Sequence, residues 1–204
     1  MNVRLTAALL ITLPFTSALA QESDPDWPCA QQLVPKIVAA QLWSGPLPDE
    51  NVAMTAPPDL SELGRNAMDS KVSEQDAVKS LKTYFAKVKS PQKRLEQIPT
   101  AFIVALTEAN SRRDRQINGI KSFTRGQFAL SKQLAADVNE LDKLTQGQPA
   151  KEGTPEKAIE EKVQFERRVF EDREHQVKYL CEAPADGEAR LGLVARTLEA
   201  LLPR

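Results

Sequence analysis

The side chains that could carry out chemistry are few in this sequence. Its 204 residues include one histidine and two cysteines. A single His excludes sites that need two imidazoles, such as the usual arrangements of zinc hydrolases. No nucleophile-elbow, dinucleotide-binding, P-loop or EF-hand motif is present. We therefore expect no catalytic residue, no metal ligand and no cofactor, and interpret the protein as a non-enzyme.

The one histidine, His175, has two interpretations. Its charge changes near neutral pH, which would suit a pH-sensitive group. It lies in the run EDREHQVKYL without a partner motif, which favours an ordinary surface position. Acidic pairs such as Glu160–Glu161 and Glu171–Asp172 have basic neighbours, a pattern typical of solvated helix faces. An enzyme that uses scattered residues is a third hypothesis, which a deep polar pocket holding His175 or several carboxylates would support.

The first twenty residues have the three regions of a secretory signal peptide. Arg4 is the basic region, Leu5 to Phe15 form an apolar stretch, and Ala18-Leu19-Ala20 is a small-x-small cleavage site. Residue 21 is Gln, so no lipoprotein cysteine follows. The sequence thus predicts cleavage after Ala20 and export to the periplasm. No later stretch is apolar over 18 residues, so we expect no stable membrane insertion of the mature chain.

Export determines how the two cysteines are interpreted. Cys29 and Cys181 enter an oxidising compartment, and an even count there predicts a disulfide. With two cysteines only one intramolecular pairing exists. Two buried free thiols or an intermolecular bridge are the alternatives. The spacing matches neither a haem-attachment motif nor a redox motif, so we expect the bridge to be structural.

A cluster of arginines stands out from an almost neutral background. The formal net charge is -1 for the whole chain, which gives no general attraction to nucleic acid. Arg112, Arg113 and Arg115 lie together in SRRDRQ, and guanidinium groups bind carboxylates and phosphates in a bidentate manner. The cluster suggests an acidic protein partner. The alternative is that it pairs internally with acids that a helical hairpin would bring near, namely Glu182, Asp186 and Glu188.

The only two tryptophans, Trp27 and Trp43, lie on either side of Cys29 and the residues that follow it. Tryptophan is common at interfaces. We expect these two side chains to pack onto the rest of the protein, with an external binding face as the second possibility.

Apolar periodicity and proline positions predict the elements. We expect a helix from Pro35 to Trp43 and a Pro-rich linker or loop over 44–70. Ser73, Ser90 and Thr154 are predicted helix caps, the last two each followed by a proline. A long helix should run over about 100–144, with a kink or a restart at Pro99, and another from 155 until Pro184 ends it. A last helix should begin near Asp186. Strand patterns are absent from the sequence.

The fold class that follows is all-α: an elongated antiparallel helical hairpin with shorter N- and C-terminal helices packed on it. A turn near residue 150 sets the register and brings Cys181 near Gly119. Gly119 and Gly126 share a helix face. They either admit the N-terminal segment or merely bend the helix. The predicted organisation is a signal peptide over 1–20, an N-terminal helix and linker over 21–70, and a helical bundle over 71–204.

The predicted function is that of an exported, non-enzymatic accessory or scaffold protein that acts by protein–protein interaction. Its partner would dock where the arginine cluster, Trp27 and Trp43 meet, rather than at the loop over 145–155. The alternative is a periplasmic chaperone-like protein that holds clients on an apolar helical groove. An exposed apolar strip on the hairpin would favour the chaperone. If the terminal helices fully covered the apolar seam between the two hairpin helices, this would favour the scaffold. The oligomeric state stays open.

Overall fold

The computed structural model describes residues 24–49 and 51–203, and these form helices connected by turns and extended segments. The predicted signal peptide over 1–20 lies outside the described residues. No strand occurs in the described ranges, which confirms the predicted all-α class. The 3-10 turn η1 spans Ala39–Gln41, and the α-helices are α1 (Val52–Thr55), α2 (Pro58–Ala67), α3 (Glu74–Lys87), α4 (Pro91–Thr145) and α5 (Pro155–Glu199).

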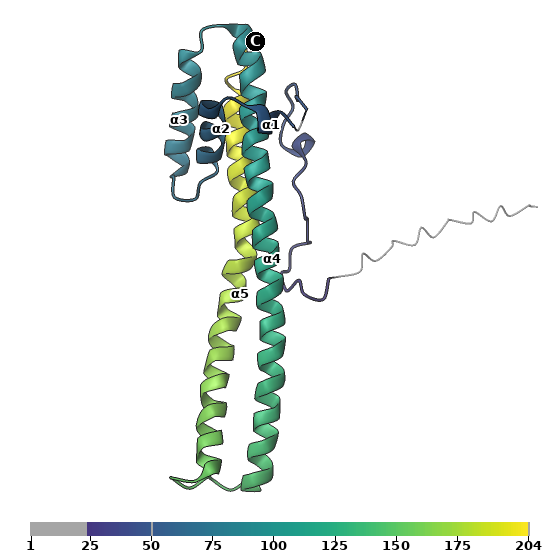
Figure 1. Cartoon of the computed structure of the whole chain (residues 1–204), viewed down its shortest axis with the longest axis vertical. Coiled ribbons are helices and arrows are strands. Elements are labelled where there is room, and N and C mark those ends of the chain that lie inside the picture. The colour runs from purple at the N-terminus through teal and green to yellow at the C-terminus, as the bar shows by residue number, and fades with distance from the viewer. Residues whose placement is uncertain (1–23, 50, 204) are drawn as a thin grey trace, which may run out of the picture.

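Helices α4 and α5 form a long antiparallel hairpin that runs the length of the molecule (Figure 1). The 55 residues of α4 give it a length of about 80 Å. The register is the one that a turn near residue 150 predicts. Lys162 on α5 forms an ion pair with Asp137 on α4 at 2.9 Å, and Gln116 donates a hydrogen bond to the carbonyl of Ala183 at 3.3 Å. The predicted elongated hairpin is confirmed.

The three predicted helix caps are present. Ser73 accepts a hydrogen bond from the backbone N–H of Asp76 at the start of α3. The Ser90 and Thr154 side chains do the same at the starts of α4 and α5. Each cap satisfies one of the N–H groups that the first turn of a helix leaves without a partner.

Two internal prolines do not end their helices, so α4 does not restart at Pro99 and α5 does not stop at Pro184. The prediction that Pro184 ends a helix was wrong, because α5 continues through it to Glu199. The carbonyl of Pro184 accepts a hydrogen bond from Arg113, and that of Ala183 accepts one from Gln116. Pro184 has no backbone N–H, so one hydrogen bond of α5 is missing there. The two hydrogen bonds from α4 stabilise this part of α5 instead. Helix α4 likewise runs through Pro99, which is buried.

The hydrophobic core lies at one end of the hairpin, where α1, α2 and α3 pack against α4 and α5 (Figure 1). We call this end the head. The buried core residues are Ile37, Ala39, Trp43, Leu60, Ala67, Met68, Leu81, Phe85, Ile98, Ala101, Phe102, Ile103, Ala105, Leu106, Ala109, Leu191, Val194, Ala195 and Leu198. All of them precede residue 110 or follow residue 190, so the rest of the hairpin has no share in this core.

The other part of the hairpin, which we call the stalk, consists of residues 121–145 of α4, the loop over 146–154, and residues 155–180 of α5. It contains four buried residues, and only Val163 among them is apolar; the others are Thr124, Gln127 and Asp137. Stalk residues on the seam between the two helices are mostly half-buried. The stalk is therefore a two-helix structure with both outer sides exposed.

The prediction of a helix from Pro35 to Trp43 was wrong, and the predicted loop over 44–70 contains the helices α1 and α2. Residues 28–38 contain no helix, and the first regular element is the short turn η1. The side chain of Asn110 explains this: it donates to the carbonyl of Ile37 at 3.0 Å and accepts from its N–H at 2.8 Å. Because α4 satisfies these backbone groups, the segment does not need a helix to satisfy them. We call residues 24–38 the strap.

Candidate interaction surfaces

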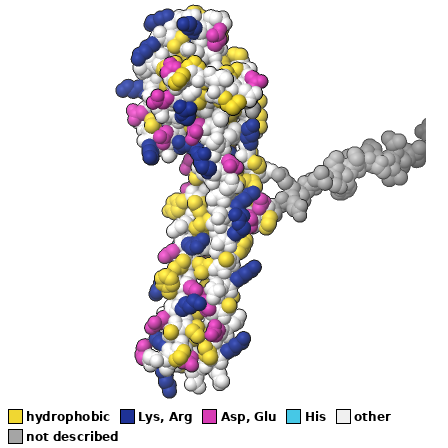
Figure 2. Space-filling view, in the orientation of Figure 1, with side chains coloured by type: hydrophobic (Ala, Val, Ile, Leu, Met, Phe, Trp, Pro, Cys, Tyr) yellow, Lys and Arg dark blue, Asp and Glu magenta, His cyan; other side chains and the backbone are white. Residues whose placement is uncertain are grey.

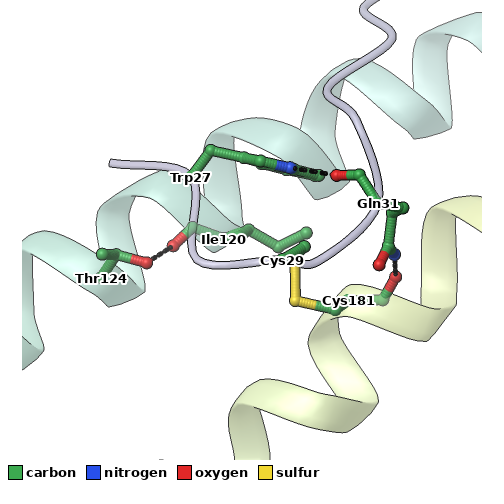
Figure 3. Close-up of a disulfide and its surroundings, with 6 residues drawn as sticks. All are labelled: Trp27, Cys29, Gln31, Ile120, Thr124 and Cys181. Atoms are coloured by element: carbon green, nitrogen blue, oxygen red, sulfur yellow. Dashed lines mark hydrogen bonds between the residues drawn. A yellow bond between two sulfur atoms is a disulfide. The ribbon is translucent and has the colours of Figure 1, made fainter. Parts of the chain in front are cut away.

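The strap is joined covalently to the hairpin near its middle. Cys29 and Cys181 form a disulfide with a Cα–Cα distance of 5.5 Å, in agreement with the predicted pairing. Figure 3 shows the side chain of Ile120 on α4 between Cys29 and the indole of Trp27. The side chain of Gln31 also donates to the carbonyl of Cys181. The bridge fixes the strap to α5 and places it along α4.

Ion pairs hold the outer end of the strap on α4. Asp24 contacts Lys121 and Asp26 contacts Arg125, each at 2.7 Å. The hydrogen bond from Lys121 and that from the backbone of Asp26 lower the pKa of Asp24. A hydrogen bond from the N–H of Trp27 to the carbonyl of Asp24 closes a turn. The turn brings Asp24 to Lys121, one helical turn nearer the head than Arg125.

Arg113 is an internal residue rather than a member of a surface cluster. Only 7% of it is exposed. Its Nε donates to the carbonyl of Val34 in the strap at 2.6 Å. Its Nη1 donates to the carbonyl of Pro184 and to Glu188, both at 3.2 Å. The expectation that Arg113 faces a partner is therefore corrected: its guanidinium joins strap, α4 and α5, and Glu188 supplies the internal pairing that the alternative interpretation predicted.

The other two arginines of the cluster remain at least partly accessible. Arg112 pairs with Glu108 at 3.0 Å and lies 3.8 Å from Asp69. Arg115 has 65% of its side chain exposed and lies 3.7 Å from the same Glu108. Since each has an acidic neighbour, the cluster presents little net positive charge.

A cavity of about 300 Å³ lies beside these arginines, between the hairpin and the segment that joins α2 to α3. Its charged lining consists of Arg112, Arg113, Arg190, Glu74, Asp186 and Glu188. Three cationic and three acidic groups balance, so the lining does not select an anion over a cation. His175 does not line this cavity.

The two tryptophans are far apart, which corrects the expectation that they meet at one docking site. Trp43 is buried in the head and stacks on Phe102, with 4.5 Å between ring centroids. Trp27 is half-buried and lies near Ile120 (Figure 3). Residues 102 and 120 are five turns apart on α4, which is about 27 Å. The indole of Trp27 donates to the carbonyl of Gln31 within the strap.

Neither glycine of the pair on α4 admits another backbone. A Cβ at Gly119 would meet nothing within 4 Å, and one at Gly126 would meet only the guanidinium of Arg173. The interpretation that these glycines admit the N-terminal segment was wrong. The strap instead crosses α4 near Ile120, Lys121 and Arg125.

A polar layer interrupts the seam of the stalk. The Asp137 carboxylate is almost fully buried and contacts Lys162 at 2.9 Å. The hydrogen bonds from Lys162 and Gln133 lower the pKa of Asp137. Burial, followed by the interaction with Asp137, raises the pKa of Glu166. Buried polar groups of this kind fix the register of paired helices at some cost in stability.

Large apolar side chains lie exposed on the stalk, between charged ones (Figure 2). The exposed fractions are 54% for Phe128, 60% for Phe165 and 70% for Tyr179. Phe165 and Tyr179 are two heptads apart and share one face of α5. None of the three was predicted as a binding residue from the sequence. The signal that could have found them is that Phe165 and Tyr179 lie off the apolar face by which α5 packs on α4.

A second apolar feature is a cavity of about 260 Å³ between α4, α5 and the strap. It lies beside Pro28, next to the turn at Asp24–Trp27. Its lining residues are Pro28, Thr124, Gln127, Phe128, Ser131, Phe170, Glu174 and Val177. Gln127 is 9% exposed, and its Oε1 has no hydrogen-bond partner in the described part of the chain.

Among residues 24–49 and 51–203, the single histidine, His175, is exposed. No group of three or more His, Cys, Asp and Glu side chains in these ranges could hold a metal ion. Within the same ranges, no helix combines the length and apolar character needed to cross a membrane.

Comparison with protein-family models, with curated proteins and with solved structures finds no match to the chain.

Proposed function

We propose that the protein is an exported, non-enzymatic accessory or scaffold protein that binds a partner protein along its stalk. The observation that carries this proposal is the position of the core. Helices α1–α3 and the strap cover the hairpin at the head and near its middle, whereas both sides of the stalk are exposed and bear Phe128, Phe165 and Tyr179. Exposed aromatic side chains of this size favour interaction sites.

The proposal includes export through a signal peptide that is cleaved after Ala20, and residence in the periplasm. The disulfide between Cys29 and Cys181 supports it, since such bonds persist in oxidising compartments. The test is fractionation of cells that express the full chain, with N-terminal sequencing of the product. We expect the periplasmic form to begin at Gln21. A cytoplasmic product that retains its first twenty residues would contradict export.

The partner is a protein, and stalk contacts are its main attachment. Arg115, the most exposed of the three arginines, provides a second, smaller contact. To test the main attachment, a photo-crosslinking residue replaces Phe165 or Tyr179 in the full chain. Lys82, which is exposed on α3 in the head, provides the matched control position. We expect one discrete adduct from the stalk positions and none from position 82.

Two results would contradict the proposal. The first is the absence of any discrete adduct from both stalk positions in cells that contain the folded protein. The second is an equally strong adduct from position 82, since this would mean that contact does not depend on the stalk.

A chaperone-like protein is the second candidate, because large aromatic side chains lie exposed on both helices of the hairpin. The scaffold is preferred because Phe165 and Tyr179 are separated by the acidic Asp172 on the same face, so they do not form one continuous apolar strip. Aggregation of reduced insulin distinguishes the two. Suppression of aggregation by stoichiometric protein, lost in a Phe165→Ser, Tyr179→Ser variant, would favour the chaperone.

A further inference from the structure

The strap lies along the side of the hairpin. It runs from Ile37, held by Asn110, past Val34, held by Arg113, to Cys29 at the disulfide. Over this stretch an extended chain lies against α4, and polar side chains bind its backbone groups. The hairpin therefore already binds one extended peptide segment, its own.

The outer end of the strap turns back on α4. Asp26 pairs with Arg125, and Asp24 pairs with Lys121, which lies one helical turn nearer the head. Pro28, the last strap residue before this turn, lines the 260 Å³ cavity, and most of the other lining residues lie toward the tip of the stalk. The cavity thus adjoins the strap on the side toward which the described strap does not continue.

The lining of this cavity is mostly apolar and includes one hydrogen-bond acceptor without a partner. Phe128 comes from α4, and Phe170 and Val177 come from α5. Gln127 donates weakly to the carbonyl of Phe170 at 3.4 Å, while its Oε1 has no partner among the described residues. A buried acceptor without a partner is unfavourable, and a donor that arrives with a ligand removes the deficit.

We propose that this cavity binds an apolar side chain of an extended segment of a partner protein, which continues the line of the strap. The volume suits one aliphatic or aromatic side chain together with its backbone. The guest segment lies between α4 and α5 as the strap does, and one of its N–H groups approaches Gln127. This inference rests on the proposed function, because it assigns a site on the stalk to the partner that the function requires.

The experiment uses the oxidised mature protein, labelled with ¹⁵N, and blocked hexapeptides of the form Ser-Ala-X-Pro-Ala-Ser. The proline keeps residue X extended. With X as Leu or Phe we expect resonances of residues 124–131 and 170–177 and the side-chain amide of Gln127 to shift, with a dissociation constant on the order of 1 mM. With X as Asp we expect no shift.

Two serines of α4 provide a blocking variant and its matched control. Ser131 lines the cavity, and Ser122 lies two and a half turns earlier, so it faces the opposite side of the helix. Both are exposed. Ser131→Trp should fill the cavity and weaken binding of the Leu peptide by about tenfold or more, whereas Ser122→Trp should leave it unchanged. Helix content measured by circular dichroism should be the same in both.

Several results would overturn the inference. They are no shift with the Leu and Phe peptides, equal shifts with the Asp peptide, or equal weakening by the two tryptophan variants. Without peptide, the resonances of residues 124–131 could also shift with protein concentration. That result would mean that a second copy of the chain occupies the cavity, and it would overturn the inference as well. If the stalk positions give an adduct but the peptides cause no shift, only the cavity inference is contradicted. If no stalk position gives an adduct, the proposed function is contradicted.

Discussion

The head and the stalk contain the same two helices, yet they bury different kinds of side chain. In the head, α4 and α5 meet helices α1–α3 and bury large apolar residues such as Phe85, Phe102 and Leu198 completely. In the stalk the same helices meet each other and, at its inner end, the outer end of the strap, and their buried residues are mostly polar. Burial of apolar area is the dominant stabilising contribution in folding. The head therefore supplies most of the stability of the molecule, and the stalk depends on it.

This difference separates two tasks along one hairpin. The head can be stable without a partner because its apolar surface is already covered. The stalk keeps aromatic side chains exposed and has fewer contacts to lose, so we expect its amides to exchange faster than those of the head. The strap lies between the two and links them through the disulfide.

The largest effect should come from truncation of an aromatic residue in the head. Phe102→Ala should lower the free energy of unfolding by about 3–5 kcal/mol, because Phe102 is fully buried and stacks on Trp43. Phe170→Ala in the stalk, where the ring is half-buried, should cost only about 1 kcal/mol. Urea unfolding followed by circular dichroism measures both. Equal losses would show that the stalk is as well packed as the head.

Removal of the bridge should have the next largest effect. The double variant Cys29→Ser, Cys181→Ser should be less stable by about 2–4 kcal/mol, since the bond joins residues 152 apart in sequence. Its strap amides should lose protection in hydrogen exchange, whereas those of α2 and α3 keep theirs. Wild-type protein treated with a reductant serves as the control. Unchanged strap protection in the variant would mean that Asn110 and Arg113 alone hold the strap.

Two glycines provide a test of opposite signs. Gly64→Ala should destabilise the head by about 1–3 kcal/mol, because the new Cβ would lie 2.7 Å from Val104. Gly119→Ala should stabilise the protein by up to about 1 kcal/mol, because nothing lies within 4 Å and alanine has the higher helix propensity. Thermal unfolding of the two single variants measures the difference. A destabilising Gly119→Ala would mean that this face of α4 is covered.

The smallest effect should come from the polar layer of the stalk. The raised pKa of Glu166 means that its protonated form stabilises the fold: this contribution is complete below its ordinary value of 4.5 and is lost as pH rises through the raised pKa. Glu166→Gln keeps a neutral group, so its stability relative to wild type should grow between pH 4 and pH 7. Hydrogen exchange of stalk amides at both pH values measures this change.

Glu161, which is exposed on the same helix, provides the control for this test. Glu161→Gln should show no such trend. The lowered pKa of Asp137 has the opposite sign: its contribution is present above the ordinary value of 3.8 and is lost as pH falls through the lowered pKa. A relative stability of Glu166→Gln that stays constant with pH would mean that the carboxyl of Glu166 is solvated.

The hairpin, its register, three caps and the disulfide pairing could be predicted from the sequence, because each depends on local spacing or on the cysteine count. The strap could not. Its apolar positions suit a helix, and it is extended only because Asn110, 73 residues away, binds both polar backbone groups of Ile37. A contact of this kind leaves no periodic pattern in the sequence.

The candidate site shows the same limit. Arg113 is surrounded by charged residues in the sequence, which is typical of a solvated face, but it is buried because carbonyls of Val34 and Pro184 and the Glu188 carboxylate meet around it. The cavity beside Phe128 is formed by α4, α5 and the strap, and its position depends on where the strap turns. Neither feature can be derived without the tertiary arrangement.

The disulfide also determines how the molecule carries mechanical load. Tension applied between the strap's outer end and the C-terminal end of α5 passes through residues 24–29, crosses the sulfur bridge to Cys181, and continues along the last part of α5. Neither the stalk nor any part of α4 lies on that route. A pull on the two ends therefore loads the end of α5 and its contacts in the head, while the stalk keeps its shape and whatever it holds.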